Sequence, residues 1–249
     1  KALEINTAAN NLWGVCAIKA SIAYCVQLAR GDISSGYETT EQAVSIAEKS
    51  GDVYSKAIAY VMHGFSSFQR GLIDDANEYL TQGIKYSEKT NFSLLTAHGR
   101  FILGHVHFVL KRYRECINQY VIAEQTWKGC DGLPSLVRYI QLATILARVC
   151  SGEETVEKES LFQVASQNRL ALHEGSVWRC VSNILIHGDG GPLVDGQYAI
   201  ERAIEADIRN GTKWSLAMNH ATYAHILGRR QLFQESQENL DKAKNIFRK

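Results

Sequence analysis

The chain has 249 residues, of which 45% are hydrophobic and 21% are charged, and its formal net charge is +1. This is the composition of a globular protein, which excludes extended disorder and low-complexity classes, and the near-neutral charge argues against a general nucleic-acid or anionic-membrane surface. Only two prolines occur, which favours long helices, and no apolar run approaches the roughly 18 residues of a membrane span.

The sequence repeats itself with a period of 40 residues. Two columns of the repeat hold small residues in five of six places. The columns read Ala43, Gly83, Ala123, Gln163, Ala203 and Ala243, and Gly36, Ala76, Cys116, Val156, Gly196 and Ser236. Such a period predicts one repeat domain over residues 1–249. In chain order we expect its units at 12–51, 52–91, 92–130, 131–173, 174–211 and 212–249.

Each unit has the pattern of a helical hairpin, which the second unit shows best. An apolar segment over 53–69 is followed by a break at Arg70-Gly71 and an amphipathic segment over 72–89. The first helix of the third unit, over 94–109, is apolar on two faces, so it must pack between other helices. Glycine or asparagine marks most unit ends, at Gly51, Asn91, Gly129, Gly175 and Gly211. We therefore predict an all-α, right-handed α-solenoid of about six antiparallel helical hairpins.

Three regions depart from the regular pattern. The fourth unit has Gln163 in a small-residue column and a polar stretch over 151–154, and the fifth carries the glycine-rich segment 188–192. We expect these two units to be degenerate or bent, and the glycine-rich segment to be a turn rather than an anion cradle, because no strand precedes it. Residues 1–12 are expected to be the tail of an earlier helix. Because the chain opens with Lys1 and ends within an amphipathic helix, we expect a fragment of a larger multidomain protein.

The repeat columns resemble the small and large positions of tetratricopeptide repeats. The matching residues are Gly64, Gly71, Ala76, Leu80 and Gly83 in the second unit and Leu103, Gly104, Tyr113, Cys116, Tyr120 and Ala123 in the third. The closing unit matches at Tyr223, Ala224, Leu227, Ser236, Leu240, Ala243, Ile246 and Phe247. The usual unit has about 34 residues, so a period of 40 resembles the long-repeat, MalT-like variety. The resemblance implies a superhelix of the type found C-terminally in bacterial signal-transduction ATPases, some with LuxR-type DNA-binding domains and others with nucleotidyl cyclase domains.

Short catalytic motifs are missing from the sequence. It contains no GxxxxGK[ST], HExxH or GxSxG pattern, so we expect no enzyme activity and no cofactor. His98, His105 and His107 share one segment and His220 and His225 another, but no cysteine or carboxylate completes a ligand set. We therefore interpret these histidines as packing or groove residues rather than as a metal site.

The cysteines are scattered, without a CxxC pair. They are Cys16, Cys25, Cys116, Cys130, Cys150 and Cys180. Such a pattern favours buried thiols in a reducing cytosol over disulfides, and we predict a cytoplasmic protein. Asn91-Phe92-Ser93 and Asn210-Gly211-Thr212 match the glycosylation pattern but are interpreted as turns.

A binding surface is therefore the function that the sequence favours. Stacked hairpins present their first helices along a concave groove, where such arrays hold a partner segment. The groove-facing candidates are Phe65, Phe68, His98, Phe101, His105, Phe108, Arg138, Gln141, Arg148, Trp178, His225 and Arg229. The aromatic members are equally consistent with packing between repeats.

Three functional hypotheses follow. The first is a non-enzymatic interaction or sensor module, which binds a protein, a peptide or another domain of the same parent chain, with no nucleic-acid or membrane partner. The second is a small-molecule effector site near Phe108, Arg138 and Arg148, suited to an anionic or sugar ligand. The third is a self-assembly scaffold that stacks end to end through its terminal repeats.

Overall fold

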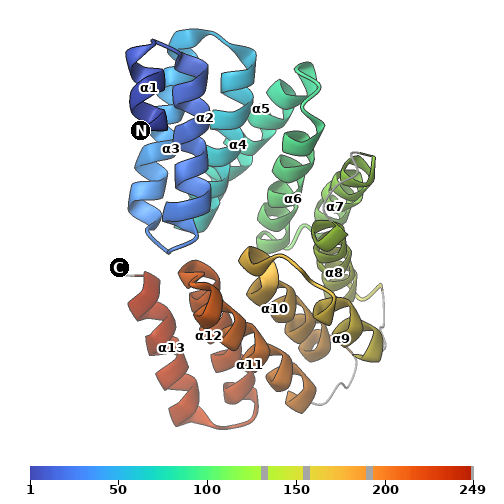
Figure 1. The fold of residues 1–249 in the computed structure, drawn as a ribbon. Helices are drawn as coiled ribbons and strands as arrows, with labels where there is room; N and C mark the ends of the chain where they lie inside the picture. The colour runs from blue at the N-terminus through green and yellow to red at the C-terminus, as the bar shows by residue number, and fades with distance from the viewer. Residues whose placement is uncertain (130–133, 154–157, 189–192, 248–249) are drawn as a thin grey trace. The chain divides into compact units, whose positions relative to one another are not determined.

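The computed structural model describes residues 1–129, 134–153, 158–188 and 193–247. Within these ranges every regular element is helical, and the predicted all-α class is confirmed (Figure 1). The first seven α-helices and one π-helical segment are α1 (Ala2–Ala8), α2 (Leu12–Ile22), η1 (Ala23–Leu28), α3 (Ile33–Ser50), α4 (Val53–Arg70), α5 (Ile73–Lys89), α6 (Ser93–Val109) and α7 (Tyr113–Lys128). The remaining six are α8 (Pro134–Ser151), α9 (Lys158–Ser166), α10 (Ala171–His187), α11 (Leu193–Asn210), α12 (Lys213–Arg229) and α13 (Phe233–Phe247).

The chain forms two compact units. The first contains 1–28 and 32–132, and hence helices α1 to α7, whereas the second contains 29–31 and 133–249, and hence helices α8 to α13. The change from one unit to the other coincides with the junction expected between the third and fourth repeats.

Consecutive helices pack against each other within each unit, as in an α-solenoid. The hairpins pair α2 with α3, α4 with α5, α6 with α7, α10 with α11, and α12 with α13. Neighbouring hairpins join through α5 on α6 and α11 on α12, while the first helices also meet, α4 on α6 and α10 on α12. This arrangement confirms five of the predicted helical hairpins, and the first helices α4, α6, α8, α10 and α12 begin at intervals of about 40 residues.

Glycines mark where the helices of a hairpin cross, and one of them, Gly83, belongs to a small-residue column. A Cβ atom on Gly83 would lie 2.7 Å from the backbone nitrogen of Val61, and one on Gly104 would lie 2.3 Å from Cε1 of Tyr120. Both approaches are too close for any side chain, so α5 reaches α4, and α7 reaches α6, only because these positions lack a Cβ.

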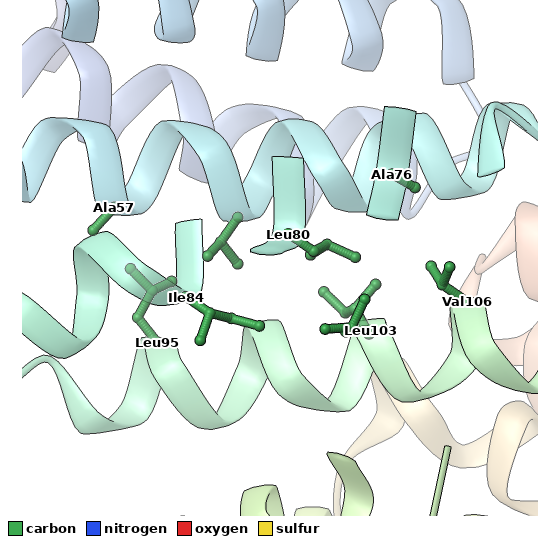
Figure 2. Close-up of a cluster of buried hydrophobic side chains, with 9 residues drawn as sticks. Ala57, Ala76, Leu80, Ile84, Leu95, Leu103 and Val106 are labelled. Carbon is green, nitrogen blue, oxygen red and sulfur yellow. The ribbon is translucent and has the colours of Figure 1, made fainter. Parts of the chain in front are cut away.

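The core of the first unit lies between α4, α5 and α6 (Figure 2). Leu80 and Ile84 of α5 point toward Leu95 and Leu103 of α6, and all four side chains are at most 6% exposed. Partly buried neighbours on α4, including Phe65, pack against this cluster. The two apolar faces predicted for the first helices are therefore both covered.

The helix boundaries follow from local capping. Asp32 and Asp52 precede α3 and α4, and the Asp52 carboxylate accepts a hydrogen bond of 2.7 Å from the Ser55 amide. Gly51 and Gly211 end their helices with φ of 69° and 72°, as expected for left-handed caps. Gly175 was interpreted as a unit end, and that interpretation was wrong. It lies buried inside α10, where a Cβ would come within 2.2 Å of the Asp207 carboxyl carbon.

The fourth repeat differs from the others. Its second helix, α9, has only 9 residues, whereas α3 and α11 have 18 each, and both α8 and α9 pack on α10. Gln163 is exposed on α9, where the other repeats bury a small residue. The expected polar stretch over 151–154 and the expected glycine-rich turn over 188–192 extend into segments 154–157 and 189–192. These two segments lie outside the described residues. Residues 2–8 form the short helix α1, which packs on α2.

Candidate functional site

The first unit gathers six of the predicted groove residues on two neighbouring helices. Phe65 and Phe68 lie on α4, and His98, Phe101, His105 and Phe108 lie on α6. They converge because α4 packs directly on α6 and because residues three or four apart share one face of a helix.

Tyr24 of η1 joins this group, although the sequence did not predict it. Its ring centroid lies 5.3 Å from that of Phe65 and 5.2 Å from that of His98, and the Phe65 and His98 rings are 6.4 Å apart. A π-helical turn inserts an extra residue, so the regular helical spacing gave no sign that Tyr24 faces α4 and α6.

Two further ring pairs extend the group along α6. The centroids of Phe68 and His105 are 6.3 Å apart, and those of Phe108 and Tyr113 are 5.7 Å apart. All of these residues are half-buried. We call the set of Tyr24, Phe65, Phe68, His98, His105 and Phe108 the aromatic surface.

A fully buried layer supports the aromatic surface. Phe101 is 4% exposed, and its ring lies 4.5 Å from His105, 5.7 Å from Tyr120 and 5.8 Å from Trp127. The ring of Trp127 also lies 6.5 Å from His98. Phe101 is therefore packing and not contact surface, because the helices around it already cover its ring.

A hydrogen bond fixes one histidine of the aromatic surface. His105 Nδ1 and the hydroxyl group of Tyr120 are bonded across the α6–α7 hairpin. Tyr120 is 2% exposed, so the orientation of the imidazole is set from below by the core. The aromatic surface is thus preorganised by contacts within the unit.

The predicted residues of the second unit are more dispersed. Arg138, Gln141 and Arg148 are half-buried on α8, and His225 and Arg229 are exposed on α12. Arg229 Nη1 donates a hydrogen bond of 2.7 Å to a backbone carbonyl in the last turn of α10. Burial, followed by the nearby charges of Arg229 and His187, lowers the pKa of His225.

Trp178 does not belong to an exposed groove. It is 7% exposed, its ring lies 6.2 Å from that of Phe162, and the Arg202 guanidinium lies over it at 5.8 Å. The Trp178 side chain thus packs α10 against both α9 and α11. Of the residues expected to form an effector site, Phe108 belongs to the first unit, and Arg138 and Arg148 belong to the second.

A buried polar network in the second unit was missed by the sequence analysis. Asp207 is 1% exposed and accepts hydrogen bonds from Thr212 Oγ1 at 2.5 Å and from Asn219 Nδ2 at 2.8 Å. Arg179 Nη1 donates to Asn219 Oδ1 at 2.8 Å and to Ser215 Oγ at 3.0 Å. Burial raises the pKa of Asp207, although its hydrogen bonds act in the opposite direction. The network connects α10, α11 and α12 and is enclosed by them.

A second polar cluster lies between α3 and α4. Thr40 Oγ1 is 2.9 Å from His63 Nδ1 and 2.7 Å from Ser66 Oγ, and His63 is 1% exposed. The rings of Tyr37 and Tyr79 lie 4.7 Å and 4.4 Å from the imidazole. Burial lowers the pKa of His63 to about 4, so this histidine is neutral near pH 7.

Histidine, cysteine, aspartate and glutamate residues do not gather into clusters of metal-ligand type in the described part of the chain. No group of three or more His, Cys, Asp or Glu residues there has the spacing to hold a metal ion. Cys16, Cys116 and Cys180 are buried, and burial raises the pKa of Cys16 to about 12. Cys130 lies outside the described residues. No helix in the ranges that the structure describes is long and apolar enough to cross a membrane.

No family model matches the chain. A solved structure similar to it is BtubC (BKLC) from P. vanneervenii, with 16% sequence identity, a TM-score of 0.42, and coverage of 99% of this chain and 91% of the other.

Proposed function

We propose that this chain is a non-enzymatic interaction or sensor module that binds a segment of a partner protein, or of another domain of its parent protein, on the aromatic surface. The observation that carries this proposal is the gathering of Tyr24, Phe65, Phe68, His98, His105 and Phe108 in one half-buried array. Aromatic side chains dominate binding energy where they are partly exposed and rigidly held.

The chemistry of the array indicates the kind of partner. Its six members offer apolar area, with imidazole and phenol groups for a few hydrogen bonds. A helix or extended segment with apolar anchor residues suits such a surface, whereas a phosphate backbone would need cations.

The side chains of the aromatic surface are held in place before a partner binds. The buried layer of Phe101, Tyr120 and Trp127 supports the aromatic surface from below. Binding a partner therefore costs little conformational entropy in these side chains. If the parent protein has two states that present this surface differently, the partner biases their equilibrium through its differential affinity. The 40-residue hairpins support placing the module in the long-repeat tetratricopeptide class, in a cytoplasmic signalling protein.

A displayed peptide library provides the test. Peptides of about 15 residues are selected against the chain, and the affinity of the best ones is measured by calorimetry for the wild type and for Tyr24→Ala/Phe108→Ala. We expect this variant to bind at least tenfold more weakly, since each lost aromatic anchor removes about 1 kcal/mol or more.

The matched control changes an equivalent pair elsewhere. Phe162 and Tyr198 of the second unit also form a ring contact, at 5.8 Å, and Tyr198 is 52% exposed. Phe162→Ala/Tyr198→Ala should bind the selected peptides like the wild type. Equal affinity for all three proteins, with helix content intact by circular dichroism, would contradict the proposal. Nucleotides and sugars added in the same assay test the small-molecule alternative.

A further inference from the structure

The turn between α11 and α12 contains Asn210-Gly211, which is the single Asn-Gly pair in the sequence. Asn210 is the last residue of α11, and Gly211 follows it with φ of 72°. A residue without a Cβ adopts this left-handed conformation at no steric cost. The fold itself therefore favours a glycine directly after Asn210.

The side chain of Asn210 joins the end of α11 to the beginning of α10. Its Nδ2 donates one hydrogen bond of 3.0 Å to the carbonyl oxygen of Ala171 and another of 3.0 Å to Oε2 of Glu174. The other carboxylate oxygen of Glu174 accepts from Arg209 Nη2 at 2.6 Å. Both bonds of Asn210 use N–H groups of its amide, which a carboxylate in the same place cannot supply.

We propose that Asn210 is a site of deamidation, with water as the co-reactant, and that this modification loosens the packing of α10, α11 and α12. In the first step the backbone nitrogen of Gly211 forms a bond with Cγ of Asn210, and the bond between Cγ and Nδ2 breaks. The attacking nitrogen loses its proton and the departing nitrogen gains one, so ammonia leaves and a five-membered succinimide remains. Water then opens the succinimide at one of its two carbonyl carbons, which gives aspartate or isoaspartate at position 210.

The surroundings of Gly211 favour the reaction at this asparagine. Gly211 is exposed, and a Cβ built on it would meet no atom within 4 Å, so nothing crowds the attacking nitrogen from that side. Asn91 also lies in a turn that ends a helix, with φ of 53°, but the side chain of Phe92 follows it and hinders the same attack. Asn210 is therefore the asparagine that we expect to react.

The hydrogen bonds of Asn210 control the rate of the reaction. Nδ2 is the atom that leaves, and its bonds to Ala171 and Glu174 hold it in the folded chain. Local opening of the contact between α10 and α11 releases these bonds without unfolding the whole unit. The rate of deamidation should therefore follow the frequency of this opening.

The products disturb two contacts at the same turn. A carboxylate at position 210 places a second negative charge beside Glu174 and an oxygen atom opposite the Ala171 carbonyl, so attraction becomes repulsion. Isoaspartate also lengthens the main chain by one atom just before Thr212. The backbone nitrogen of Thr212 donates to Asp207 O at 3.1 Å, and its hydroxyl bonds to the Asp207 carboxylate, so the longer chain disrupts the buried polar network.

Peptide mapping by mass spectrometry tests the modification in the folded chain. Over several weeks at about 37 °C and pH 8, the peptide that contains Asn210 should become heavier by one mass unit, and the peptide that contains Asn91 should not. Glu174→Ala removes one of the two hydrogen bonds, so this variant should react several-fold faster. Glu88→Ala is the matched control, because it removes an ion pair with Arg100 in the first unit.

The outcomes of this experiment are distinct. The rate at Asn210 in Glu88→Ala should equal that of the wild type, and circular dichroism should show the same helix content in all three proteins. A folded wild type that keeps Asn210 intact, or equal rates in Glu174→Ala and the wild type, would overturn the proposal.

Asn210→Asp, which imitates one product, tests the structural consequence. It should lower the urea midpoint of the second unit and speed hydrogen exchange in α10, α11 and α12. In a Glu174→Gln background the loss should be smaller, because the glutamine amide can donate to the new carboxylate. An unchanged midpoint, or the same loss in both backgrounds, would contradict the loosening. Neither experiment involves the aromatic surface, so this proposal and the proposed function can fail separately.

Discussion

Replacement of Gly83 by alanine tests whether the small-residue columns hold the hairpins together. A Cβ on Gly83 would lie 2.7 Å from the Val61 backbone nitrogen, 2.8 Å from Val61 Cγ2 and 3.1 Å from the Tyr60 carbonyl carbon. Two of these three atoms are backbone, so the clash is relieved only if α4 and α5 move apart.

The magnitude follows from two opposing terms. Alanine favours the helix over glycine by about 1 kcal/mol, whereas overpacking a closed crossing costs about 1 to 3 kcal/mol and occasionally more. Because the contact is with backbone, we expect the cost to prevail and the first unit to lose about 1 to 2 kcal/mol.

The control is another helical glycine, Gly228, which does not lie at a close crossing of two helices. A Cβ on Gly228, inside α12, would meet Ser236 Oγ at 3.5 Å, which is an ordinary contact. Gly228→Ala should therefore stabilise its hairpin by up to about 1 kcal/mol. Urea unfolding followed by circular dichroism measures both variants. A Gly83→Ala protein as stable as the wild type would refute the role assigned to the columns.

The remaining predictions concern the two buried polar clusters and their dependence on pH. Because burial lowers the pKa of His63 to about 4, below the usual 6.5, the unfolded chain takes up the proton first as pH falls, so the first unit should lose stability between about pH 6.5 and pH 4, by at most about 3 kcal/mol. Urea unfolding at several pH values should show a shallower loss for His63→Gln, and an equal slope in both proteins would contradict the assignment. Asp207→Ala should destabilise the second unit by about 2 kcal/mol, because Thr212 and Asn219 then lose a buried acceptor. Hydrogen exchange should localise that loss to α10, α11 and α12, and a uniform change over the first unit would contradict it.

The helical hairpins were predictable because their cause is local and periodic. A glycine or alanine column at a spacing of 40 residues indicates a helix crossing, as Gly83 shows. The gathering of Phe65, Phe68, His98 and His105 was predictable for the same reason, since steps of three and four residues on adjacent helices share a face.

The position of Tyr24 and the buried polar network could not be predicted, because the contacts that form them do not recur at a regular spacing in the sequence. Tyr24 reaches Phe65 and His98 through a π-helical turn, which breaks the regular spacing. Arg179 and Asp207 are linked through Asn219, and a polar side chain buried by three helices looks the same in sequence as an exposed one.

The burial of aromatic residues was also beyond the sequence. A first helix is apolar on two faces, and spacing alone does not say which ring its neighbours cover completely. Phe101 is covered because Tyr120 and Trp127 of α7 are large, and Trp178 because Phe162 and Arg202 enclose it. The interpretation of Gly175 was wrong because this glycine leaves room for the buried Asp207 carboxylate. In sequence, such a glycine looks the same as one that ends a helix.

The most direct test of the central claim is quantitative capture of partners from the lysate of the cells that produce this protein. The wild type is compared with Tyr24→Ala/Phe108→Ala, and with Phe162→Ala/Tyr198→Ala and Arg138→Ala/Arg148→Ala as variants of the second unit. We predict that a specific partner bound by the wild type is lost from the first variant and retained by the other two. Retention of every specific partner by a folded Tyr24→Ala/Phe108→Ala protein would contradict the account.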